Sequence, residues 1–188
     1  MPPRILSRRS LSGDALDVAP SLLNKVLVHG DRAGRIVEVE AYRGAEDPAS
    51  HAYRGVTPRT AVMFGPAGYL YVYFSYGMHW CANVVTGAVG DPQAVLLRAV
   101  EPLEGMDAIR AARPRARRDR DLANGPAKLC EALGIGQWAN GVALGADVGG
   151  RSIRLLDDGT PPPAVPLVGP RVGISVAQEI PWRFRVPS

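Results

Sequence analysis

A group of polar side chains that could carry out chemistry lies between residues 38 and 51. Glu38, Glu40 and Tyr42 occupy alternate positions, which places them on one face of a β-strand, together with Ile36. Asp47 and His51 follow a few residues later. Carboxylates and a histidine are candidates for general acid–base work or for a metal site, although their spacing matches no strong metal motif. A strand whose polar face lies in water gives the same pattern, so both interpretations stay open at this point.

An aromatic run at residues 69–76 is the second candidate. Alternate positions hold Tyr69, Tyr71 and Tyr73, and between them lie Leu70, Val72 and Phe74. On a strand the tyrosines therefore share one face. Tyr76 precedes Gly77, where the chain can turn, so Tyr76 is expected at an exposed tip. Such a stripe is typical of ordinary sheet packing, and it also suits a surface on which nucleobases stack while a tip residue wedges into a duplex.

The composition is that of an ordinary globular domain. The chain has 188 residues, of which 46% are hydrophobic and 21% charged, and this is enough apolar material for one core. An excess of 22 Lys+Arg over 18 Asp+Glu gives a net charge of +4, which is compatible with a polyanionic partner without requiring one. Because only Lys25 and Lys128 are lysines, nearly all the positive charge is arginine, whose planar fork suits phosphate.

The cysteines and the N-terminal segment indicate the compartment. Cys81 and Cys130 have no metal-ligand spacing and are expected to be reduced core residues. Residues 1–12 are polar and basic and carry no secretion signal, and no apolar run is long enough to span a bilayer. We therefore expect a cytoplasmic protein with no membrane partner.

The elements that must position these residues are mostly strands in the middle of the chain. Apolar patterns predict strands at residues 26–29, 34–42, 69–74, 82–86 and 94–100, and short closing strands at 171–176 and 184–186. Gly30-Asp31-Arg32 marks a hairpin between the first two strands. Helices are predicted at residues 14–24, where Pro20 interrupts or ends the helix, and at 104–112 and 127–133.

The last predicted helix has the clearest start and stop signals. Asn124 is expected to cap it, Pro126 lies in its first turn and Gly134 can end it. Before it lies an arginine-rich stretch, expected to be a loop that is either solvated or in contact with phosphate, with Arg113, Arg115, Arg117, Arg118 and Arg120. Since no alternating βαβ rhythm is present, we expect an α+β domain with a largely antiparallel sheet flanked by helices.

Several motifs spread along the chain resemble the alkyladenine (3-methyladenine) DNA glycosylase family. They begin with Glu38-Val-Glu40-Ala-Tyr42, Ser50-His51, Thr57-Pro58-Arg59 and Met63-Phe64. The central motifs are Tyr71-Val-Tyr73-Phe-Ser-Tyr76-Gly77-Met78, Cys81-Ala-Asn83 and Val95-Leu-Leu-Arg98-Ala-Val-Glu101-Pro102-Leu103-Glu104-Gly105. The last are Gly125-Pro126-Ala-Lys128-Leu129-Cys130 and Arg171-Val172-Gly173-Ile174. Several motifs in the same order make a specific signal, whereas any one alone is weak.

The resemblance implies roles for eight side chains. It implies that Glu40 deprotonates the attacking water and that Arg98 helps to hold this water. In the base pocket it implies Tyr42 and His51 on one side of the flipped base and Tyr73 on the other. The remaining implied roles belong to Asn83, which crowds the exocyclic amine of guanine, to Tyr76, which fills the gap left in the duplex, and to Met78, which supports Tyr76. Glu38 is expected to support the strand or to pair with an arginine.

The protein that the resemblance implies is a monofunctional DNA glycosylase. Such an enzyme flips alkylated or deaminated purines, of the 3-methyladenine and hypoxanthine type, out of double-stranded DNA. It then hydrolyses the N-glycosidic bond with an activated water and so initiates base excision repair. The resemblance further implies a single compact catalytic domain over residues 1–188 with a curved sheet, no cofactor and no metal, and a monomer of bacterial type associated with the nucleoid.

Two functions of other classes compete with this interpretation. A non-catalytic nucleic-acid-binding module of related fold predicts tight, salt-sensitive binding without base release, and it leaves Glu40 without a task. A metal-dependent hydrolase built from Glu38, Glu40, Asp47 and His51 predicts that a chelator abolishes activity.

Overall fold

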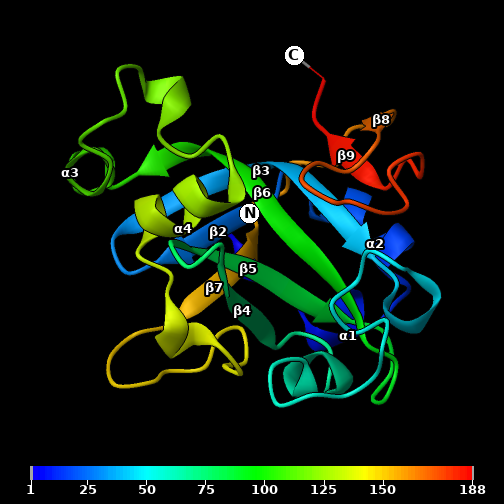
Figure 1. The fold of residues 1–188 in the computed structure, drawn as a ribbon. Coiled ribbons are helices and arrows are strands. Elements are labelled where there is room, and N and C mark those ends of the chain that lie inside the picture. Colours follow the sequence, from blue (N-terminus) through cyan, green and yellow to red (C-terminus); the bar gives the residue numbers. More distant parts are fainter. Residues whose placement is uncertain (1, 188) are drawn as a thin grey trace.

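A curved antiparallel sheet forms the framework of the protein (Figure 1). The computed structural model of the chain describes residues 2–187. Its strands are β1 (Arg4–Ile5), β2 (Val26–His29), β3 (Arg32–Tyr42), β4 (Leu70–Ser75), β5 (His79–Thr86), β6 (Gln93–Glu104), β7 (Ile153–Asp157), β8 (Leu167–Gly169) and β9 (Arg183–Arg185). They are ordered β1-β7-β2-β3-β6-β5-β4, with β9 paired to β3 and β8 paired to β9. All pairings between these strands are antiparallel, which confirms the predicted sheet.

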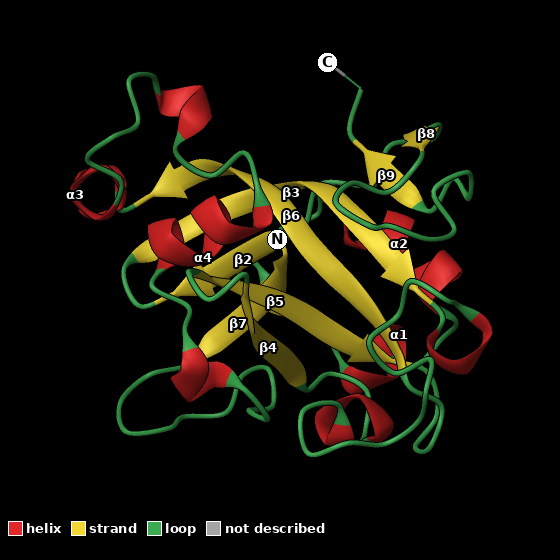
Figure 2. Cartoon of the chain, viewed as in Figure 1, coloured by secondary structure: helices red, strands yellow, loops and turns green. Residues whose placement is uncertain are grey.

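Short helices flank this sheet (Figure 2). The α-helices are α1 (Arg8–Leu11), α2 (Ala15–Leu22), α3 (Met106–Ala112) and α4 (Pro126–Leu133), and the 3-10 helices are η1 (Gly44–Glu46), η2 (Ala61–Phe64), η3 (Asp119–Asp121) and η4 (Gln137–Ala139). Helix α2 packs against β3, and α4 packs against β5 and β6. The α+β class is therefore confirmed. Within residues 2–187, no helix combines the length and the apolar character that crossing a membrane needs.

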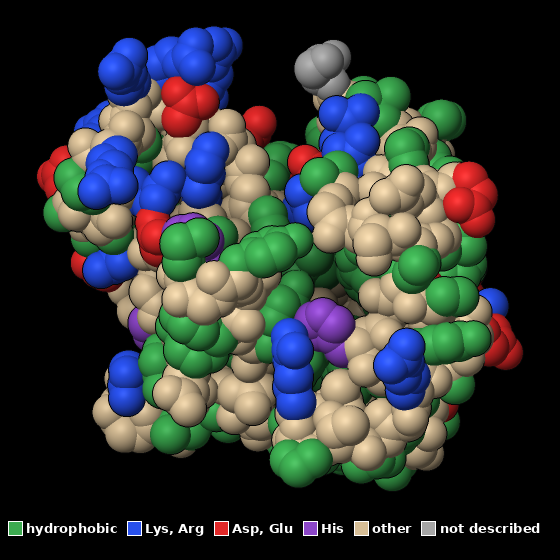
Figure 3. Space-filling view, viewed as in Figure 1, with side chains coloured by type: hydrophobic (Ala, Val, Ile, Leu, Met, Phe, Trp, Pro, Cys, Tyr) green, Lys and Arg blue, Asp and Glu red, His purple; other side chains and the backbone are tan. Residues whose placement is uncertain are grey.

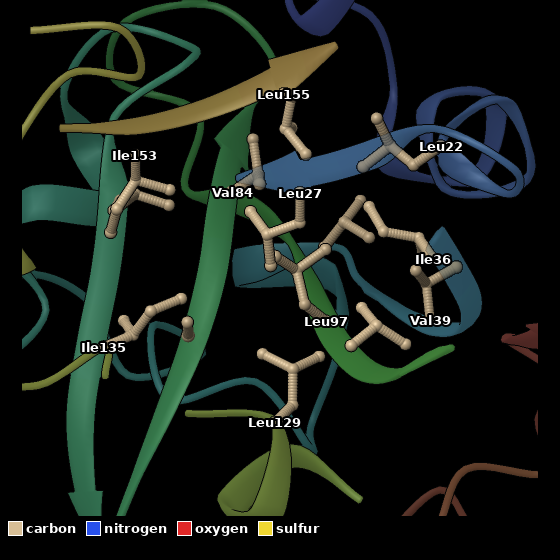
Figure 4. Close-up of a cluster of buried hydrophobic side chains, with 14 of the residues drawn as sticks. Leu22, Leu27, Ile36, Val39, Val84, Leu97, Leu129, Ile135, Ile153 and Leu155 are labelled. Carbon is tan, nitrogen blue, oxygen red and sulfur yellow. The ribbon is translucent and has the colours of Figure 1, made fainter. Parts of the chain in front are cut away.

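The main hydrophobic core lies where the sheet curves around the inner faces of α2 and α4. Figure 4 shows side chains from both helices and from five strands meeting there, among them Leu22, Leu27, Ile36, Val39, Val84, Leu97, Leu129, Ile153 and Leu155. Each is 1% exposed or less, and burying one such side chain contributes about 1.5–3 kcal/mol. A second, smaller cluster contains Met63, Tyr71 and Val85. Because Tyr71 alternates with the core residues Leu70 and Val72 along β4, this second cluster lies on the opposite face of the strand.

Strand β3 departs from simple alternation near Val37. Its register with β6 shifts between Ile36 and Glu38 and again between Glu38 and Val39. Ile36 and Val39 both lie in the main core although they are three positions apart, so the expectation that Ile36 shares a face with Glu38 is wrong. A bulge adds one residue to a strand and reverses the alternation beyond it. Because of the bulge, β3 places Ile36 and Val39 in the core on either side of it. Glu38 and Glu40 on the same strand then point away from the core.

The predicted strand at residues 171–176 is absent. Arg171 is buried in an ion pair, and the backbone N–H of Val172 donates to a glutamate side chain instead of to a neighbouring strand. The predicted helix at 104–112 begins later, because β6 continues to Glu104 and Gly105, with φ of 71°, separates the two elements. Apolar alternation cannot foresee either result, since each depends on a distant partner.

The helix predicted around residue 130 is confirmed, but its cap is not. Gly125, in an extended conformation, precedes Pro126 at the first helical position, and Gly134, with φ of 69°, ends the helix. The Asn124 side chain instead bonds to Asp121 and Lys128. In α2 the predicted interruption by Pro20 does not occur, because the helix continues through it to Leu22.

Candidate active site

A cavity of about 530 Å³ opens beside the ends of β3, β4 and β5, a size suited to one small ligand. The space-filling view shows this face of the molecule hollowed near its centre (Figure 3). Among its lining residues are Tyr42, His51, Arg59, Tyr71, Tyr73, Tyr76, Asn83, Arg98, Val172 and Ile174. Five segments that are far apart in the sequence therefore form one pocket, since Pro126 also lines it.

Glu40 lies directly behind the lining of this cavity. Its side chain is fully buried, and its Oε2 accepts a hydrogen bond of 2.9 Å from the hydroxyl of Tyr42. Its Oε1 accepts one of 2.8 Å from the N–H of Val172 and lies 3.2 Å from Nη1 of Arg98. All three partners line the cavity. We call Glu40 and these three residues the cavity floor.

Burial and hydrogen bonding act on Glu40 in opposite directions. Burial raises the pKa of the Glu40 carboxyl above its ordinary value, because the charged form loses its hydration. Arg98, the Val172 N–H and the Tyr42 hydroxyl each lower the pKa of Glu40, but burial dominates. A carboxylate with a raised pKa binds a proton more readily, which is the property that a general base needs.

Glu38 has the supporting position that the sequence predicted for it. Its Oε1 accepts hydrogen bonds from Nε of Arg98 at 2.9 Å and from Nη1 of Arg183 at 3.3 Å. Arg98 thus bridges the two glutamates that follow the bulge. Because Arg98 is held by both carboxylates, its guanidinium has a defined orientation beneath the cavity.

A buried ion pair fixes the ring of Tyr42. Arg171 and Asp47 are fully buried and form two hydrogen bonds with each other. Arg171 also donates to the carbonyl of Ala41 at 3.1 Å, and its Cζ lies 4.7 Å from the centroid of the Tyr42 ring. Breaking such a pair typically costs about 3–5 kcal/mol, because it leaves one charge buried alone. The segment that carries Val172 is therefore tightly anchored beside the floor.

Aromatic rings from β4 and from the loop before it form one wall of the cavity. Tyr71 and Tyr73 stack with centroids 5.5 Å apart, and the ring of His51 meets Tyr73 edge-on at 4.5 Å. A base sandwiched between two rings separates them by twice the spacing of a stacked pair. His51 and Tyr73 thus meet in the same wall, whereas the resemblance implied that they lie on opposite sides of a base. Tyr42, which belongs to β3, is the aromatic residue available for the other side.

His51 is held neutral in this wall. Its Nδ1 lies 3.0 Å from the hydroxyl of Tyr71, and its Nε2 makes no protein hydrogen bond within residues 2–187. Burial, and to a smaller extent the nearby charge of Arg59, lowers the pKa of His51 to about 4. Near pH 7 a neutral imidazole remains, which can exchange hydrogen bonds with an uncharged base.

Asn83 lies opposite Tyr71 on the paired strand β5. Its side chain is buried, and its Nδ2 donates a hydrogen bond of 3.0 Å to the carbonyl of Tyr71. Because this bond fixes the amide, the position of its oxygen is also fixed. Asn83 is therefore a rigid polar group in the lining, as a residue that excludes one base substituent must be.

The turn between β4 and β5 projects at the rim of the cavity. Ser75 pairs with His79, and Tyr76, Gly77 and Met78 form the connection, which we call the hairpin tip. Tyr76 and Gly77 adopt positive φ angles of 51° and 64°. Tyr76 is 83% exposed and Met78 is 67% exposed. Two large apolar side chains in water are unfavourable unless a partner covers them.

The structure thus gathers most of the predicted site residues around one cavity. Tyr42, His51, Tyr73, Tyr76, Asn83 and Arg98 line it, Glu40 lies behind the lining, and Met78 lies beside it at the hairpin tip. The sequence analysis gave no role to Arg59, Tyr71, Val172 or the Asp47–Arg171 pair. The motifs contained most of these residues, but only tertiary contacts reveal what they hold.

The four side chains of the metal-hydrolase alternative do not form one cluster. Glu38 and Glu40 share Arg98, Asp47 binds Arg171, and His51 meets Tyr71. Within residues 2–187, no group of three or more His, Cys, Asp or Glu side chains is arranged to hold a metal ion. The geometry therefore lends this alternative no support.

Comparison with known proteins gives a consistent result. A family model described as "Methylpurine-DNA glycosylase (MPG)" matches residues 9–188. A relative from Burkholderia lata, provisionally named a 3-methyladenine DNA glycosylase, is 57% identical over 188 residues, which cover 99% of this chain and 89% of the relative. A relative from Frankia casuarinae with the same provisional name is 50% identical over 183 residues, covering 90% of this chain and 82% of the relative.

Proposed function

Because the chain belongs to the methylpurine-DNA glycosylase family, we propose that it is a 3-methyladenine DNA glycosylase that acts on double-stranded DNA. Membership of the family confirms the resemblance found in the sequence motifs. We propose further that the whole chain, residues 1–188, is one catalytic domain that works as a monomer. The match of one family model to residues 9–188 supports the single domain.

One observation carries the proposed chemistry: a buried glutamate has all of its hydrogen-bond partners in the lining of one aromatic cavity. In the reaction, water attacks the sugar carbon as the bond to the purine nitrogen breaks, and Glu40 accepts a proton from this water. The products are a free base and an abasic site. The carboxylate also stabilises positive charge on the sugar, and Arg98 orients both the carboxylate and the water. General-base catalysis of this kind contributes about 10²–10⁴-fold.

The water can reach Glu40 only if one contact in the cavity floor opens. Glu40 has no exposed surface, and its two oxygens are occupied by Tyr42, Val172 and Arg98. Arg98 lines the cavity, and its contact of 3.2 Å with Oε1 is the longest of the three, so we propose that the water inserts between these two groups while the Tyr42 hydrogen bond persists. We propose that the base stacks between Tyr42 and the wall of His51 and Tyr73.

The substrate has to leave the duplex before it can fill this cavity. Extruding a nucleotide costs a few kcal/mol, and stacking on aromatic side chains recovers about 1–3 kcal/mol for one base. Tyr76, supported by Met78, is positioned to fill the space that the base leaves. Asn83 stands where it can exclude the exocyclic amine of guanine, whereas hypoxanthine lacks this amine and fits. The proposed lesions are therefore alkylated and deaminated purines.

The test is release of a base by the wild-type protein. Duplexes with one 3-methyladenine or one hypoxanthine are incubated with the protein and a chelator, and abasic sites are then cleaved with alkali and counted. The proposal predicts strand cleavage at the lesion position only, with the chelator present. Tight binding to both duplexes without any abasic site would contradict it and would favour a non-catalytic binding module.

A further inference from the structure

A second hollow, of about 690 Å³, lies outside the candidate active site in the arginine-rich segment after α3. Cationic side chains dominate its lining, which consists of Arg113, Arg115, Ala116, Arg117, Arg118, Asp121 and Lys128. Figure 3 shows Lys and Arg side chains gathered over α3 and the loop that follows it, on the same face as the hollow near the centre of the view. We call this feature the arginine hollow.

The charges of the arginine hollow are only partly compensated. Arg113 pairs with Glu131, and Arg118 pairs with Asp121 at 2.8 Å. Five cationic side chains line the hollow, and these two carboxylates leave a surplus of three positive charges. Within the described part of the chain, no carboxylate oxygen lies within 4.0 Å of the guanidinium of Arg115 or of Arg117. Like charges held close together repel one another, so an anion in the hollow would relieve this repulsion.

The loop that forms the hollow is pinned at both ends. The N–H of Arg113 bonds to the carbonyls of Ile109 and Arg110 at the end of α3, and its Nε donates to the carbonyl of Leu122. Ala116 packs against the main core. These contacts hold Arg115 and Arg117 on either side of Ala116, which packs inward.

Helix α4 connects the arginine hollow to the base cavity. Pro126 lines the cavity and Lys128 lines the arginine hollow. These residues lie two apart in one helix, where each residue advances about 1.5 Å along the axis. Both hollows open on the same face of the molecule (Figure 3), so a DNA strand with one nucleotide in the cavity can extend along this face toward the arginine hollow.

We propose that the arginine hollow binds phosphodiester groups of the DNA strand beside the flipped nucleotide. The inference rests on the proposed function, because that function brings the strand to α4. Arginine forks bind phosphate oxygens through paired N–H groups, and such contacts hold a protein in register without reading the base sequence. The hollow supplies salt-dependent affinity and takes no part in breaking the glycosidic bond.

The test compares a double variant, Arg115→Gln with Arg117→Gln, with the wild type. Binding to a lesion-free duplex is measured by fluorescence anisotropy at several salt concentrations. Each lost phosphate contact lowers the slope of log K against log salt by about 0.9, so we expect the slope to fall by about 2 and the affinity to fall about 10-fold or more. The rate of base release at saturating protein should change less than about 2-fold, because the cavity is untouched.

The matched control removes two arginines elsewhere, Arg4→Gln with Arg9→Gln. Both are exposed and line neither hollow. An equal loss of slope in this control would show an effect of net charge alone and would overturn the proposal, as would an unchanged slope in the test variant. A pair of lysines at positions 115 and 117 (R115K with R117K) should restore much of the slope, since charge is kept while the fork is lost. The binding readout also separates the two proposals, because a protein that releases no base can still show the predicted change of slope.

Discussion

The cavity floor and the hairpin tip differ most in how their side chains are held. At the floor, Glu40 is fully buried and each of its oxygens has a protein partner. At the tip, Tyr76 is 83% exposed, and its backbone adopts a φ of 51° that few residues other than glycine favour. Both oxygens of the Glu40 carboxylate have protein partners without a ligand, whereas the tip leaves Tyr76 and Met78 in solvent.

This difference separates two tasks that one cavity must perform. Groups that move a proton have to be preorganised, because reorganising them during the reaction adds to the barrier. A side chain that enters a duplex has to project into solvent from the surface of its own protein. We therefore expect changes at the floor to reduce the rate of base release, and changes at the tip to reduce capture of the lesion with little effect on folding.

The largest effect is expected from Glu40→Gln. The variant keeps the shape of the side chain but cannot accept a proton, so the single-turnover rate of base release should fall about 10²–10⁴-fold. Glu38→Gln is the matched control, because Glu38 lies on the same strand and bonds to the same arginine but contacts neither Tyr42 nor Val172. Equal losses in the two variants would show that neither glutamate has a special role as the base.

A smaller effect is expected from Tyr42→Phe, which removes one hydrogen bond to Glu40 and keeps the ring. A hydrogen bond to a charged group contributes about 1.5–3 kcal/mol, so the rate near pH 7 should fall about 10–100-fold. The proposed base is the ionised form of Glu40, so we expect the rate to rise with pH through the pKa of this group. Because the Tyr42 hydroxyl lowers the pKa of Glu40, its removal should move this rising limb to higher pH. A limb that stays in place or moves to lower pH would contradict the assignment.

At the hairpin tip, Tyr76→Ala should weaken binding to a lesion duplex by about 10-fold, since one aromatic stacking contact contributes about 1–3 kcal/mol. The free energy of unfolding should change by less than about 0.5 kcal/mol, because 83% of the side chain is exposed. Tyr53→Ala, another exposed tyrosine, serves as the control for nonspecific loss. A marked drop in thermal stability would show that the tip belongs to the folded core after all.

The smallest expected effect concerns charge selection at the wall. The Cζ of Arg59 lies 5.3 Å from the centroid of Tyr73, and no carboxylate oxygen of residues 2–187 lies within 4.0 Å of its guanidinium. This charge repels a cationic alkylated base, but water screens it because Arg59 is exposed. Arg59→Gln should therefore raise kcat/KM for 3-methyladenine relative to hypoxanthine by about 3–10-fold, whereas Arg54→Gln, on the same loop, should leave the ratio unchanged.

Much of the framework could be predicted from local patterns. Apolar alternation located β2, β3, β4 and β6, and Gly30 with Asp31 marked the hairpin between the first two. The short strands β1, β7 and β8 were not predicted. They are too short to show apolar alternation, and they form by pairing with strands that are distant in the sequence. The bulge at Val37 was missed for a similar reason, since it shows only in the register with β6.

The site illustrates the same limit. Motifs in the right order identified the family and the lining of the cavity, but alternation placed Ile36 on the wrong face and the assigned roles put His51 opposite Tyr73. The ion pair of Arg171 with Asp47 joins residues 124 positions apart, and no local sequence pattern predicts it. Sequence can thus indicate candidate reacting groups, while the contacts that support them are long-range.

The most direct test of the division between floor and tip is to watch base extrusion in a variant that cannot complete the reaction. A duplex carrying hypoxanthine beside a fluorescent adenine analogue brightens when the neighbouring base leaves the stack. The account predicts that Glu40→Gln brightens this duplex as the wild type does but releases no base on the same timescale, and that Tyr76→Ala brightens it less. Release of the base by Glu40→Gln at the wild-type rate would contradict the central claim that Glu40 activates the water.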